Sequence, residues 1–201
     1  MPMQYVHAFI DELEVPRARK PILQHLVNTY VSETNKVGAV WSELQDNQLE
    51  FRIHPRSSSV RQILTHQILS EARFFAEFIG LPEPRAESLL PPGEAPPLRS
   101  YIDRFISLAR ARLPALAAGE EDFWLTEVSF FDVRRQRIWV FWRRVLHTAH
   151  HRAQVGDCLR LLNAKVPATY GPTADVTWSG ADPTTTVEAA GRPYAGRTSP
   201  P

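Results

Sequence analysis

The sequence predicts an all-α protein, an up-and-down four-helix bundle followed by an irregular C-terminal tail. Three observations indicate this fold. Four long stretches lie between clusters of proline, their apolar residues recur every three or four positions, and no stretch alternates apolar and polar residues as a strand would. The connections between the four stretches are short, as in a bundle.

The first predicted helix runs from Ile22 to about Asp46. Its apolar stripe consists of Leu23, Leu26, Val27, Tyr30, Val37, Trp41 and Leu44. The second predicted helix runs from Val60 to Ile79. Ser59 precedes it and Gln62 follows three residues later, which is the capping-box arrangement that satisfies free amide groups at a helix start. Gly80 is expected to end this helix.

The third predicted helix begins at Leu98 and ends at about Leu113, because Pro114 follows. A loop over 120–133 leads to the fourth helix, over 134–163. The first half of that helix is apolar on nearly every side, with Trp139, Phe141 and Trp142 close together. Such a helix needs a second cover besides its own bundle, so we expect a homodimer.

Composition limits the class of protein. With 201 residues the chain suits one domain, which we place at 18–171, and the tail at 172–201 is rich in Thr, Ala, Gly and Pro without periodicity. Lys and Arg number 23 against 22 Asp and Glu, so no basic surface for nucleic acid is expected. No stretch approaches the roughly 20 apolar residues of a membrane span.

The N-terminal sequence and the cysteine content predict the cellular compartment. The N-terminus lacks the charged and then apolar order of a signal peptide. The single cysteine, Cys158, excludes an intramolecular disulfide framework and a cysteine-rich zinc site. We therefore expect a cytoplasmic protein.

Three of the seven histidines fall within five residues of the fourth helix. Residues four apart lie on one helix face, so His147 and His151 could share one metal ion, whereas His150 points about 100° away from His151. His66 on the second helix is the candidate third ligand, because bundle helices lie about 8–10 Å apart. Spacing alone leaves an alternative, in which all of them are surface histidines.

A resemblance favours the metal site. The stretches SSSVRQILTHQILSEARFF, LHTAHHRAQVGDCLRLLNAKVP and TYGPTAD together resemble the DinB family (DinB/YfiT-like metal-binding four-helix bundles), over about residues 18–175. In that family three histidines bind a divalent metal, and the matching positions here are His66, His147 and His151. Ala153 stands where the family often has glycine, and the tail is longer; neither difference removes a ligand.

The resemblance implies a metal-dependent enzyme that acts on a small molecule. Ni²⁺ or Zn²⁺ would be the first candidates, because imidazole suits both, followed by Mn or Fe. Relatives include transferases that use a low-molecular-weight thiol such as bacillithiol, mycothiol or glutathione. The alternatives are a metal-binding or stress-response protein without turnover, and a metal-dependent hydrolase.

Four other kinds of residue could contribute to a site or to the fold. Glu71 is the one candidate acid or base, with a solvated or arginine-paired glutamate as the alternative. We expect Arg152 to form a structural ion pair and Cys158 to be a buried apolar side chain, about 10 Å along the helix from His151. His25 and His54 have no partner at ligand spacing and are expected to be structural.

Overall fold

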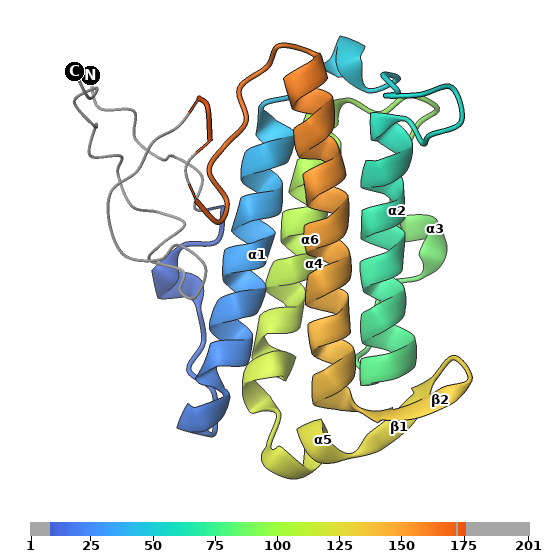
Figure 1. Cartoon of the computed structure of the whole chain (residues 1–201). Coiled ribbons are helices and arrows are strands. Elements are labelled where there is room, and N and C mark those ends of the chain that lie inside the picture. The colour runs from blue at the N-terminus through green and yellow to red at the C-terminus, as the bar shows by residue number, and fades with distance from the viewer. Residues whose placement is uncertain (1–8, 172, 176–201) are drawn as a thin grey trace, which may run out of the picture.

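In the computed structural model, which describes residues 9–171 and 173–175, four long helices form a bundle (Figure 1). They are α1 (Gln24–Ser42), α2 (Val60–Arg73), α4 (Leu98–Ala118) and α6 (Arg137–Leu161). Both α1 and α2 contact α4 on one side and α6 on the other. The predicted all-α bundle is confirmed.

The connection between α2 and α4 returns along the bundle instead of turning tightly. It carries the short helix α3 (Ala86–Leu89) and ends near the start of α2, where Arg61 Nη1 donates to the carbonyl of Pro96 at 2.7 Å. The end of α4 lies near the start of α1, because the amide of Arg19 donates to the carbonyl of Ala117. Within the bundle α2 and α4 therefore run in the same direction, so this pair departs from the predicted up-and-down order, because its connection spans the length of the bundle.

The helix α1 is buried all round in its middle, from Ser32 to Val40. A short 3-10 helix, η2 (Pro21–Leu23), precedes it, so the regular helix begins two residues later than predicted and ends at Ser42 instead of near Asp46. Segments that precede and follow the bundle in sequence cover the buried polar residues of α1. Asn35 exchanges two hydrogen bonds with the backbone of Ile10, and Tyr170 donates to Glu33 at 2.7 Å.

The helix α2 begins as predicted. The hydroxyl of Ser59 accepts from the Gln62 amide, and the Gln62 side chain accepts from the Ser59 amide, so the capping box is complete. The helix continues as a π-helical segment, η4 (Phe74–Ile79). It ends at Gly80, whose φ of 78° is in the left-handed region that glycine tolerates best.

The predicted end of the third helix near Pro114 is wrong, because α4 continues through this proline to Ala118. Pro114 is exposed, whereas Leu113, Leu116 and Ala117 around it are buried. A proline removes one backbone hydrogen bond from a helix. Burial of these apolar side chains offsets that loss, and the exposed turn lets water satisfy the free carbonyl.

The expectation of a plain loop over 120–133, without strands, is also wrong. This region forms a short helix, α5 (Glu121–Leu125), and then an antiparallel hairpin of β1 (Glu127–Phe130) and β2 (Val133–Gln136). Phe131 occupies the turn at a φ of 55°. The last helix therefore starts at Arg137 instead of Arg134, and it ends at Leu161 instead of Asn163.

The described helices include none that is long and apolar enough to cross a membrane. Apart from 173–175, the predicted tail at 172–201 lies outside the described residues.

Candidate metal centre

The structure brings His66, His147 and His151 together where α2 faces α6. His147 Nε2 lies 3.3 Å from His66 Nε2 and 3.2 Å from His151 Nε2. One ligand atom from each residue can be chosen so that all three lie within 4.8 Å of one another. His66 is exposed and the other two are half-buried, so the cluster is a shallow site at the surface.

These spacings fit a metal ion. Two imidazole nitrogens bound at 2.0–2.1 Å to a tetrahedral Zn²⁺ are roughly 3.3 Å apart, which is close to both of the short nitrogen distances here. Such an arrangement uses three protein ligands and leaves further coordination positions to small molecules. The donor set suits zinc, nickel and iron better than the hard cations Mg²⁺ and Ca²⁺.

The surroundings of His147 and His151 favour their neutral imidazole forms. Burial, together with the neighbouring His151 and His66, lowers the pKa of His147 to about 4. Burial also lowers the pKa of His151, against the opposing effect of its hydrogen bond to Gln154. Neutral imidazoles are the form that binds metals, so at neutral pH little proton release would accompany binding.

Gln154 orients one of the candidate ligands, a role that the sequence analysis did not predict. Its Oε1 accepts a hydrogen bond from His151 Nδ1 at 2.8 Å, which places the proton on Nδ1 and leaves Nε2 free as a ligand. The other end of the amide, Nε2, lies 3.2 Å from His150 Nε2. The spacing of three residues on one helix is the signal that could have identified this contact.

A pocket of about 240 Å³ opens beside the cluster. His66 and His151 line it, together with residues of the loop before α2. The remaining lining residues are Ile53, Ser57, Ser58, Gln62, Ile63, Gln154 and Cys158. Cys158 is buried as expected and is absent from the metal-ligand group, but it lines this pocket. Burial, and next Asp157, raise the pKa of its thiol.

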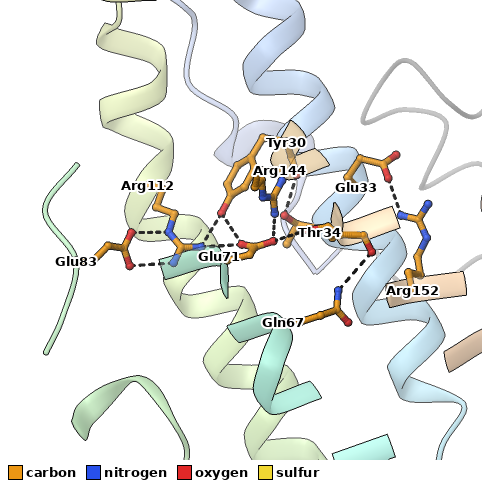
Figure 2. A network of polar contacts seen from close by, with 10 residues as sticks. Tyr30, Glu33, Thr34, Gln67, Glu71, Glu83, Arg112, Arg144 and Arg152 are labelled. Carbon is orange, nitrogen blue, oxygen red and sulfur yellow. Dashed lines mark hydrogen bonds and ion pairs between the residues drawn. The ribbon is translucent and has the colours of Figure 1, made fainter. Parts of the chain in front are cut away.

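Glu71 does not join the histidine cluster. It lies in a buried ionic network between α1, α2, α4 and α6, where it pairs with Arg112 at 2.8 Å and with Arg144 (Figure 2). Thr148 donates to the same carboxylate at 3.2 Å, and Glu83 forms a two-pronged ion pair with Arg112. Glu71 therefore has the arginine-paired role that was the alternative to an acid or base.

The network is next to the candidate ligands in sequence and space. Gln67 follows His66, Thr148 follows His147, and the Gln67 amide donates to the Thr148 carbonyl at 3.4 Å. This contact joins α2 to α6 directly behind the cluster.

The other residues named in the sequence analysis contact neighbouring side chains or backbone and do not join the histidine cluster. Arg152 pairs with Glu33 at 2.6 Å, as predicted. His25 stacks on Trp142, with ring centroids 6.1 Å apart, and His54 accepts from the Arg56 amide within a surface turn. His150 is exposed, and it is not part of the three-histidine group.

Comparison with known proteins places this bundle in a family. Two solved structures have the same fold. A DinB-like protein from Bacillus cereus ATCC 10987 aligns with a TM-score of 0.59 at 20% identity, over 69% of this chain and 91% of that one. The DinB-like protein YjoA from Bacillus subtilis aligns with a TM-score of 0.55 at 16% identity, over 75% and 97%.

A search of curated proteins gave no match. The sequence model of the DinB superfamily matches residues 30–155, which is more than half of the chain and includes all three clustered histidines. The chain therefore belongs to the DinB superfamily.

Proposed function

We propose that His66, His147 and His151 hold one divalent metal ion through their Nε2 atoms, and that the protein is a metal-dependent enzyme acting on a small molecule. The convergence of the three nitrogens, at 3.2 and 3.3 Å from His147 Nε2, carries this proposal. Zn²⁺ and Ni²⁺ are the first candidates, followed by Mn and Fe.

A divalent ion held by three neutral ligands lowers the pKa of a small molecule bound to it, which creates a nucleophile near neutral pH. The chain's own residues prepare the site for this. Burial keeps His147 and His151 uncharged, and Gln154 fixes the proton of His151 on the nitrogen that points away from the cluster.

The adjoining pocket supports a thiol-dependent transferase. No Asp or Glu lines it among the described residues, so the chain supplies no carboxylate there as a general base. A free thiol has a pKa of about 8.5 and water one of 15.7, so a thiol depends less on such a base. The lining combines serines and glutamines with the apolar Ile53 and Ile63, which suits a neutral small molecule.

The metal is tested by elemental analysis of the purified protein. We expect about one divalent ion per chain. Replacing His66, His147 or His151 with alanine should remove it, whereas His150→Ala, on the same helix and outside the cluster, should retain it. Equal metal content in all four variants would exclude the proposed ligand set.

Gln154 offers a finer test of the site. Gln154→Leu removes the acceptor for His151 Nδ1, and loss of such an outer contact typically weakens metal binding about 10- to 100-fold. Competition with a chromophoric chelator measures this change. Gln154→Glu retains an acceptor oxygen and should bind more tightly than Gln154→Leu.

The activity is tested with a panel of thiols: bacillithiol, mycothiol, glutathione and coenzyme A. The metal-loaded protein should accelerate conjugation of one of them to an electrophile, and His66→Ala should abolish the acceleration while circular dichroism stays helical. Metal binding without turnover of any thiol would favour the alternatives, a hydrolase or a binding protein. Titration of the cobalt-substituted protein with each thiol separates binding from chemistry.

A further inference from the structure

One face of α6 is exposed along nearly its whole length. Its residues follow one another at steps of three or four, which is the spacing of a helix-pairing seam. They are Trp139, Arg143, Leu146, His150, Ala153, Asp157 and Leu161. The three large apolar side chains among them, Trp139, Leu146 and Leu161, are 42%, 63% and 59% exposed. In Figure 1 no other described element passes in front of α6.

The charges on this face are arranged symmetrically about His150. Arg143 precedes His150 by seven residues and Asp157 follows it by seven. Both are exposed, and no ion pair of either appears in the part of the chain that the structure describes. The apolar residues Trp139 and Leu161 stand eleven residues on either side of the same centre.

We infer that two copies of this chain pair through α6, antiparallel and about a twofold axis at His150. A twofold axis makes every contact occur twice, so Arg143 would face the partner's Asp157 at two places. Trp139 would likewise face the partner's Leu161 at both ends of the seam. A parallel pair would instead place Arg143 against the partner's Arg143.

A pocket beside α6 provides a second, independent fit. It has a volume of about 320 Å³ and lies between the C-terminal half of α6 and the segment around Pro167. Gly156 and Arg160 line it, together with Val40 of α1, so it lies on the α1 side of the seam.

Trp142 lies on the same side, because it stacks on His25 of α1. The twofold axis keeps the α1 sides of both copies together and brings residue 142 of one copy level with residue 158 of the other. The partner's Trp142, which is 37% exposed in the single chain, would therefore lie over this pocket. The pocket, which Tyr170 of its own chain lines, would gain a second aromatic side chain from the partner.

The pairing leaves the three-histidine cluster accessible. His147 and His151 point towards α2, on the side of α6 opposite to Trp142 and the pocket at Gly156. Metal content and dimerisation are therefore expected to vary independently. His66→Ala should abolish the first and leave the second unchanged.

Charge reversal tests the pairing. Light scattering of the full chain at micromolar concentration should give a mass of two chains of 22.9 kDa. Arg143→Glu and Asp157→Arg should each weaken the dimer by at least tenfold, and the double variant should restore it. Arg99→Glu, a charge reversal of an exposed arginine on α4, is the control and should have no effect. A monomer for the unchanged chain would overturn the inference.

A cross-link tests the position of the axis. The only cysteine is 2% exposed, so an introduced surface cysteine would be the reactive thiol. His150→Cys should form an intermolecular disulfide under mild oxidation, whereas Ser107→Cys, exposed on α4, should not. A dimer in which His150→Cys fails to cross-link would show that the two copies pair in another way.

Discussion

Glu71→Gln should be among the most destabilising substitutions of a charged residue in this protein. The carboxylate is 2% exposed and faces two arginines, Arg112 and Arg144. The substitution preserves the size of the side chain and removes its charge. Arg112 retains its ion pair with Glu83, whereas the guanidinium of Arg144 has no acceptor other than Glu71 among the described residues.

The magnitude follows from the state of Arg144 after the change. In the intact network burial lowers the pKa of Arg144 to about 10, which leaves the guanidinium charged at pH 7, and arginine side chains are not deprotonated in proteins. Removing one partner of a buried pair leaves an uncompensated buried charge and costs about 3–5 kcal/mol. Folding free energies are about 5–15 kcal/mol in total, so the variant would lose a large share of its stability.

Equilibrium urea unfolding measures this loss, and Glu77→Gln on the same chain segment is the matched control. Glu77 pairs with Arg73 at the surface, where both side chains are about half exposed, so its substitution should cost at most about 0.5 kcal/mol. Arg144→Met in the Glu71→Gln background should recover part of the loss, because it removes the unpaired charge. Equal losses for Glu71→Gln and Glu77→Gln would refute this account of the network.

Two further predictions concern glycine and pH. Gly156→Ala should stabilise the protein by about 0.5–1 kcal/mol, because its new Cβ would touch nothing within 4 Å. Gly38→Ala should not show this increase in stability, because its Cβ would lie 2.5 Å from the Phe9 ring. Thermal melts that rank Gly38→Ala as the more stable variant would contradict the packing. Burial raises the pKa of Glu33, but Arg152 and a neighbouring lysine outweigh this effect, so the pKa lies below its ordinary value. The ionised Glu33 therefore stabilises the fold above about pH 4.3, and this stabilisation is lost as the pH falls through the folded-state pKa. In urea unfolding at a series of pH values, the free energy of unfolding of Glu33→Gln should fall less at acid pH than that of the unchanged protein. An equal fall in both proteins would exclude this role of Glu33.

Local sequence signals predicted the parts of the fold that local interactions determine. The start of α2 follows from a capping box of four residues, and its end from Gly80. The approach of His147 to His151 follows from their spacing on one helix. The approach of His66 to them needed the resemblance, because it depends on how two helices pack.

The wrong predictions concern places where packing outweighs local preference. Pro114 indicates a helix end by its own chemistry, and only the burial of residues further along α4 shows why the helix continues. The hairpin has four-residue strands and a turn at Phe131 and Asp132 without glycine or asparagine, so neither alternation nor turn chemistry revealed it. Glu71 could be understood only after Arg112 and Arg144 were placed beside it.

The burial of α1 by segments that come much later in the sequence also affects when this helix can fold during synthesis. Glu33 in this helix pairs with Arg152 and accepts a hydrogen bond from Tyr170, across 119 and 137 residues of sequence. The ribosome releases α1 early and these partners late. Until then the Glu33 carboxylate, which is buried in the folded protein, is exposed to water in the nascent chain. Contacts this distant in sequence also form slowly. We therefore expect α1 to reach its final environment only after α6 and Tyr170 have left the ribosome, and to be open to chaperone binding until then.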